Sequence, residues 1–209
     1  MKNTDIAIIS MSCRFPDADN IQLFWENLVS GKSSIQDIPQ DRWDAKSFYN
    51  PIKGTPGKAN TKFGTFLNNI KNFDPDFFNI NENDAMIMDP QQRILIELAY
   101  EAIISSNYEI KDLSGKKIGV FLGITKSDYM DFVQEGVLTG RLKQNTVVIG
   151  VLRNLIASRI SNLFDFCGPS MTIDTACSSA HVSLHIARES ILSGTCEMAL
   201  VGGINLNLT

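Results

Sequence analysis

Histidine is scarce in this sequence, and its cysteines lack the spacing of metal ligands. The 209 residues include two histidines and four cysteines, and no two cysteines form a C-x-x-C pair. A structural zinc site needs clustered Cys and His ligands, so this pattern predicts no metal site. Disulfides are rare in a cytosolic chain of this size. We therefore interpret Cys13, Cys167 and Cys196 as small buried apolar residues.

Long apolar runs and an excess of positive charge are also missing. Charged residues interrupt the longest apolar stretches, which predicts that no segment spans a membrane. The net charge of −4 argues against nucleic acid as a partner. Residues 1–5 have neither the basic nor the apolar region of a signal peptide, so we expect a cytoplasmic protein.

What the sequence does contain is an alternation of apolar runs with amphipathic segments. Such an alternation is typical of an α/β fold, in which helices cover the faces of a sheet. Strands are predicted at residues 6–9, 118–123, 171–173 and 198–204. Helices are predicted at residues 22–30, from Asp89-Pro90 to about Ile103, at residues 146–166, and from about Ser178 to Leu192.

Residues 33–88 interrupt this alternation. Aromatic residues there stand among proline, glycine, asparagine and aspartate, and periodicity is weak. The segment is too aromatic for a disordered linker. We expect a long packed excursion, and loops of this length are usually functional.

The stretch Asp174 to Ala180 (DTACSSA) carries the strongest chemical signal. It places Cys177 after a predicted strand and at the first turn of a predicted helix. Unpaired N–H groups and the helix dipole stabilise a thiolate at such a position. The thiolate can attack a thioester carbonyl, and the same N–H groups can receive the resulting oxyanion. Small neighbours on both sides allow an acyl chain to approach.

Simpler interpretations compete with this one. Cys177 can be a structural thiol like the other cysteines. His181 or His185 can be a general base, but four residues along a helix correspond to about 5–6 Å, whereas a base must reach the thiol within about 3 Å. We interpret both histidines as ordinary helix residues.

Four charged residues have both a structural and a functional interpretation. Asp174 can belong to a catalytic triad or can hold the turn before the helix, and we favour the turn. Asp89 is expected to cap its helix. Arg93 and Arg159 can bind carboxylates or the phosphate of a substrate, and we favour salt bridges. The pair Gly202-Gly203 allows close approach of backbone, without the pattern of a nucleotide-binding loop.

Several motifs together resemble a known family. They are residues 8–16 (IISMSCRFP), 41–43 (DRW), 56–58 (PGK), 88–93 (MDPQQR), 119–123 (GVFLG), 174–179 (DTACSS) and 194–205. Standing in this order, they closely resemble the β-ketoacyl synthase (ketosynthase) domain of modular type I polyketide synthases, from about Asp5 to the last residue. The sequence departs from the usual pattern at Ser10, Ser12, His181 and Asn207.

The resemblance implies a thiolase-like fold with α-β-α-β-α layers, of which residues 1–209 are the N-terminal half. It also implies that Cys177 accepts an acyl group from the phosphopantetheine arm of an acyl carrier protein. A malonyl-type unit on a second carrier then loses CO2 and attacks the Cys177 thioester in a Claisen condensation, as in polyketide or fatty acid biosynthesis. No cofactor is expected to bind directly, and the full domain is expected to be a homodimer.

The family's catalytic histidines and lysine lie in its C-terminal half, which the 209 residues do not include. We therefore expect this chain to hold the nucleophile without the decarboxylation machinery. One alternative is a catalytically silent half-domain that another polypeptide completes. A more remote alternative is a thiol hydrolase that uses Cys177 alone.

Overall fold

The computed structural model describes residues 5–142 and 150–208. It divides into two compact units, each described below by itself. The larger unit contains Met1–Ser12 and Lys71–Asn205, and the smaller contains Cys13–Ile70 and Leu206–Thr209.

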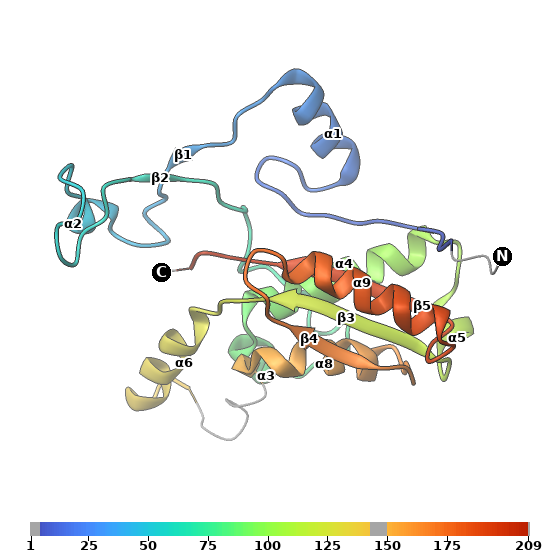
Figure 1. The fold of residues 1–209 in the computed structure, drawn as a ribbon. Helices are drawn as coiled ribbons and strands as arrows, with labels where there is room; N and C mark the ends of the chain where they lie inside the picture. Colours follow the sequence, from blue (N-terminus) through green and yellow to red (C-terminus); the bar gives the residue numbers. More distant parts are fainter. Residues whose placement is uncertain (1–4, 143–149, 209) are drawn as a thin grey trace. The chain divides into compact units, whose positions relative to one another are not determined.

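A three-stranded parallel sheet forms the centre of the larger unit (Figure 1). The middle strand is β3 (Ile118–Ile124), between β4 (Ser170–Ile173) and β5 (Met198–Ile204). Every residue of β3 is buried, which explains why its sequence is a continuous apolar run rather than an alternating one. All three strands were predicted from the sequence.

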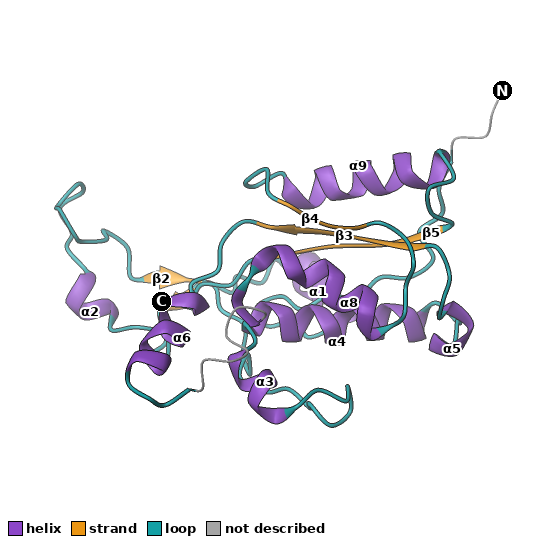
Figure 2. Ribbon diagram, turned by 90° about the horizontal axis from the view of Figure 1, so that it is seen from below, coloured by secondary structure: helices purple, strands orange, loops and turns teal. Residues whose placement is uncertain are grey.

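Helices cover both faces of this sheet, as expected for an α/β fold. Figure 2 shows α9 (Ser179–Leu192) on one face and both α4 (Pro90–Ser105) and α8 (Ile156–Leu163) on the other. The buried residues of α9 are Ser179, Ser183 and Ala187, spaced four apart. Because these side chains are small, α9 can lie close to the strands.

The first turn of α4 is buried in the larger unit. Asp89 caps the helix as predicted, and its Oδ1 accepts a hydrogen bond from the N–H of Gln91 at 2.8 Å. Both Gln91 and Gln92 are fully buried. The Gln92 amide and the Asp89 N–H donate to the Gly150 carbonyl at 2.7 and 2.9 Å.

The helix predicted at residues 146–166 is interrupted in its described part, where Gly150 and Val151 are helical, and residues 146–149 lie outside the described residues. Leu152 has an extended backbone, followed by the 3-10 turn η2 (Arg153–Leu155) and then by α8. The Gly150 carbonyl already accepts two hydrogen bonds from the start of α4. Tertiary hydrogen bonding thus replaces the helical ladder that the apolar pattern indicated.

The strand predicted at residues 6–9 is also wrong. The segment is irregular, and the side chains of Ile8 and Ile9 are 74% and 52% exposed. An apolar run becomes a strand only when another strand supplies hydrogen-bond partners, and no such pairing occurs among the residues that the structure describes.

The cysteine expectation holds for one of its three members. Cys196 is buried against Phe121 and Ala187. Cys13 is half-buried and Cys167 is exposed, so a buried apolar role is wrong for Cys167. Cys167 follows the end of α8 in a loop, where its backbone N–H binds the Lys116 carbonyl while its side chain reaches solvent.

The smaller unit contains α1 (Ile21–Ser30), β1 (Gln36–Asp37), α2 (Ala45–Phe48) and β2 (Phe63–Gly64). As predicted, α1 ends at Gly31, which adopts the left-handed conformation with φ 65°. The two short strands pair antiparallel, and Trp43 packs edge-on against Phe66 at 5.8 Å between ring centroids.

Three further helices belong to the larger unit: α3 (Glu82–Ile87), α5 (Ile110–Leu113) and α6 (Tyr129–Leu138). Part of the aromatic excursion also lies there, where Phe73 and Phe78 stack at 5.4 Å between ring centroids. Within residues 5–142 and 150–208, each helix is too short or too polar to cross a membrane.

Candidate active site

Cys177 lies in the tight turn that joins β4 to α9, and its side chain is exposed. The helix begins at Ser179 with Ser178 as the capping residue, so Cys177 precedes the first helical turn rather than lying in it. The reason is Ala176, whose φ of 57° makes a left-handed turn. That conformation costs a non-glycine residue about 1–2 kcal/mol, so the surrounding contacts must stabilise it.

Hydrogen bonds hold both ends of the Ala176 residue. Its N–H donates to Asp174 Oδ1 at 3.1 Å. Its carbonyl accepts from the Ser179 hydroxyl at 2.7 Å, the Ser179 N–H at 3.1 Å and the Thr125 hydroxyl at 3.2 Å. Thr125 follows β3, so a neighbouring strand contributes to this turn.

Two backbone donors expected to receive an oxyanion already have partners. The N–H of Ser178 donates to the Thr175 carbonyl at 3.4 Å, and that of Ser179 donates to the Ala176 carbonyl. The expectation that these first N–H groups are free is therefore not met at Ser178 and Ser179.

Two glycines let the start of α9 lie directly against the ends of two strands. A Cβ added at Gly123 would come within 2.5 Å of the Ala180 backbone nitrogen. One added at Gly203 would come within 2.8 Å of the Ala180 Cβ. The close approach expected at Gly203 is confirmed. The role of Gly123 was not predicted, although a glycine near the end of a buried strand is a signal that could have indicated it.

Asp174 performs the role of a turn-holding residue. Besides accepting the Ala176 N–H, its Oδ2 lies 3.5 Å from Nη1 of Arg153, and both side chains are half-exposed. An exposed ion pair of this kind contributes little to stability. Through this ion pair, the Arg153 side chain of η2 contacts the turn that contains Cys177.

The other charged candidates lie elsewhere in the larger unit. Burial lowers the pKa of Arg93, whose Nη1 donates to the Lys71 carbonyl at 3.3 Å. Burial likewise lowers the pKa of Arg159, and the carboxylate of Asp84 opposes that shift. Asp89 is 1% exposed and acts as a helix cap. None of these observations places the arginines against a substrate.

His181 and His185 are exposed on α9. Among the residues described, neither imidazole forms a hydrogen bond with Cys177. Their interpretation as ordinary helix residues stays a prediction. Within the described ranges, no group of three His, Cys, Asp or Glu side chains is arranged to hold a metal ion.

A hollow of about 450 Å3 adjoins the turn that contains Cys177. Its lining consists of Thr125, Lys126, Ser127, Met130, Val151, Leu152 and Arg153. Two lining residues contact the turn itself, because Thr125 donates to the Ala176 carbonyl and Arg153 pairs with Asp174. The hollow thus borders residues that hold this turn, and its lining has both apolar and polar side chains.

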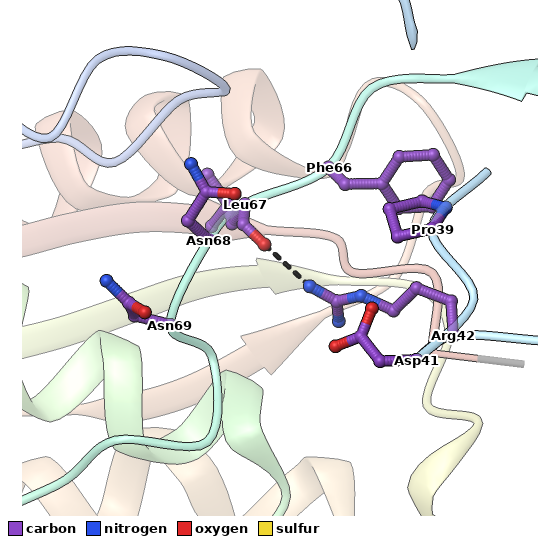
Figure 3. A pocket seen from close by; sticks show the side chains of 7 residues that line it. All are labelled: Pro39, Asp41, Arg42, Phe66, Leu67, Asn68 and Asn69. Carbon is purple, nitrogen blue, oxygen red and sulfur yellow. Dashed lines mark hydrogen bonds between the residues drawn. The ribbon is translucent and has the colours of Figure 1, made fainter. Parts of the chain in front are cut away.

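Figure 3 shows a second hollow of about 460 Å3, in the smaller unit. Arg42 lies at its edge and donates to the Leu67 carbonyl at 2.6 Å. The same guanidinium lies over the Phe66 ring, 5.9 Å from its centroid. The lining contains neither a thiol nor an imidazole, so it offers no group comparable to the exposed thiol of Cys177.

Comparisons with known proteins agree on one family. Residues 3–209 match the family model described as "Beta-ketoacyl synthase, N-terminal domain". The polyketide synthase PksL of Bacillus subtilis (strain 168) is 37% identical over 211 residues, which cover 98% of this chain and 5% of PksL.

Solved structures give the same result. The oxazolomycin ketosynthase domain OzmH KS7 of Streptomyces albus JA3453 superposes with a TM-score of 0.89 at 35% identity, covering 97% of this chain and 34% of that domain. The ketosynthase from module 6 of the bacillaene synthase of Bacillus subtilis 168 superposes with a TM-score of 0.82 at 37% identity, over 97% of this chain and 32% of that one. The 209 residues therefore have the thiolase-like fold of the N-terminal part of such domains and span about a third of their length.

Proposed function

The chain belongs to the β-ketoacyl synthase family, and we propose that it is the part of a polyketide ketosynthase that accepts the growing acyl chain on Cys177. The observation that supports this role is the exposed Cys177 thiol on a tightly held turn at the end of the sheet. The other exposed cysteine, Cys167, lies in a loop without such a turn.

The proposed transfer is an exchange of thioesters. The Cys177 sulfur attacks the carbonyl carbon of an acyl group attached to phosphopantetheine on an acyl carrier protein. A new C–S bond forms to Cys177, the bond to the phosphopantetheine sulfur breaks, and that sulfur leaves as a thiol after taking up a proton. No metal or bound cofactor takes part in this step.

The second step is proposed for the complete domain. A malonyl-type unit on a carrier loses CO2, and the resulting carbanion attacks the Cys177 thioester to give a β-ketoacyl chain. The histidines that assist this step in the family belong to its C-terminal half. The chain is thus proposed to contribute the nucleophile, with the condensation machinery supplied by further residues or by another polypeptide.

The test of this function is transfer of an acyl group from an acyl-pantetheine thioester to the 209-residue chain. We expect intact-mass analysis to show one added acyl group, and peptide mapping to locate it on Cys177. No adduct, or an adduct on Cys167 instead, would contradict the proposed role. Release of free acid without a stable adduct would favour the thiol hydrolase alternative.

The hollow beside the turn is proposed to hold the first part of the acyl chain. Met130 lines it and packs on the cluster formed by Ile87, Val133 and Val151. Replacing Met130 with tryptophan adds bulk at this wall. Because a filled pocket rejects longer chains, we expect octanoyl transfer to slow about tenfold relative to acetyl transfer.

The matched control is Leu138→Trp, at the opposite end of α6, where the side chain is 87% exposed. This variant adds the same bulk to the same helix away from the hollow. The octanoyl-to-acetyl ratio should equal that of the wild type. An equal loss in both variants would show that the hollow does not bind the acyl chain.

A further inference from the structure

Hydroxyl groups from two different elements meet at one carbonyl next to the nucleophile. The Thr125 hydroxyl donates to the Ala176 carbonyl at 3.2 Å and lies 3.3 Å from the Ser179 hydroxyl. The Ser179 hydroxyl donates to the same carbonyl at 2.7 Å and accepts from the Thr175 N–H at 2.9 Å. One small cluster therefore connects β3, the turn and the start of α9.

The cluster stabilises a conformation that alanine rarely adopts. Ala176 has a positive φ, and this turn determines where Cys177 stands relative to β4 and α9. Without its hydroxyl partners, the residue is free to relax toward the ordinary negative-φ regions. Relaxation would move the Cys177 sulfur away from the position that faces the thioester.

The same hydrogen bonds act on the peptide group that includes the Cys177 N–H. Because the Ala176 carbonyl belongs to that peptide group, three donors on its oxygen increase the polarity of the group. The Cys177 N–H thereby becomes a stronger donor. A stronger donor beside the reacting carbon stabilises negative charge as it develops on the carbonyl oxygen.

We propose that Thr125 and Ser179 are positioning residues, whose hydroxyls hold the left-handed turn at Ala176 so that Cys177 is aligned for acyl transfer. This inference rests on the proposed role of Cys177 as the acyl acceptor. Thr125 is the informative member, because it is exposed, whereas Ser179 is buried at the start of α9.

The experiment compares Thr125→Val with wild type in the 209-residue chain. Valine keeps the shape and removes the hydroxyl. Two rates are measured on each protein: acyl transfer from an acyl-pantetheine thioester, which requires alignment, and iodoacetamide labelling of Cys177, which requires only an accessible thiol. We expect acyl transfer to fall about tenfold or more. Labelling of Cys177 relative to Cys167 should change less than about twofold, because Cys177 remains exposed.

The chain supplies its own controls. Cys167 is exposed and serves as the labelling standard in the same molecule. Cys196 is 1% exposed and burial raises the pKa of its thiol, so labelling there reports unfolding. Thr125→Ser restores the hydroxyl and should restore acyl transfer. Ser190→Ala, which removes a hydroxyl bonded to the Ile186 carbonyl farther along α9, should leave both rates unchanged.

Each remaining outcome is decisive. Wild-type acyl transfer in Thr125→Val would overturn the inference. A loss of transfer accompanied by labelling of Cys196 would also overturn it, since Thr125 would then support the fold and not the alignment of Cys177. If wild type itself accepts no acyl group, the proposed function fails and the inference falls with it.

Discussion

Cys177→Ala is expected to abolish the acyl adduct while leaving the fold intact. Alanine removes the only sulfur on the nucleophile turn, and no covalent thioester can form there without it. The Cys177 side chain is exposed, so its removal opens no cavity in the core. We expect at least about a thousandfold slower transfer, with an unchanged melting temperature. Intact-mass spectrometry and a thermal melt measure the two quantities.

Cys167→Ala is the matched control for this prediction. Cys167 is the other exposed thiol of the described chain, and it lies in the loop between α8 and β4. Its removal should leave acyl transfer at the wild-type rate. An adduct that persists in Cys177→Ala and disappears in Cys167→Ala would show that Cys167 is the acyl acceptor, which would contradict our proposal.

Of the substitutions proposed above and below, Gly123→Ala is expected to lower the free energy of unfolding the most. The added Cβ would approach the Ala180 nitrogen to 2.5 Å and the Ser179 carbonyl carbon to 2.6 Å. These are backbone atoms at the start of a helix, so no side-chain rotation can relieve the contact. Overpacking of this kind costs about 3 kcal/mol or more in the free energy of unfolding, which denaturant titration would measure. Displacing the start of α9 should also slow acyl transfer.

The neighbouring strand offers a matched glycine. At Gly202 an added Cβ would lie 3.2 Å from Leu122 Cδ2, the flexible end of a side chain. We expect Gly202→Ala to cost less than about 1 kcal/mol, because Leu122 can shift slightly. Equal destabilisation by both variants would show that the contact between the added Cβ at Gly123 and the start of α9 does not cause the loss of stability.

Local patterns were sufficient for the elements whose own residues carry a strong signal. The fully buried β3 was visible as a continuous apolar run, and Asp89 with Pro90 was recognised as the start of α4 from capping chemistry alone. The candidate nucleophile Cys177 was likewise proposed from the sequence, because it stands between a strand and a helix in a short specific motif.

Local patterns failed wherever distant residues compete for the same backbone groups. The predicted helix over residues 146–166 was interrupted because the Gly150 carbonyl binds the start of α4, far away in sequence. The apolar run at residues 6–9 is exposed because pairing, which no single segment contains, decides whether a run becomes a strand.

The sequence by itself determined the family, the alternation of strands and helices that makes an α/β sheet, and the candidate nucleophile Cys177. Each of these depends on residue types at short, regular spacing. Only the tertiary structure decided that Cys177 stands before the helix on a left-handed turn at Ala176, and that Thr125 from another strand holds this turn. Such contacts join residues about fifty positions apart, and their geometry depends on how the elements pack rather than on any local pattern.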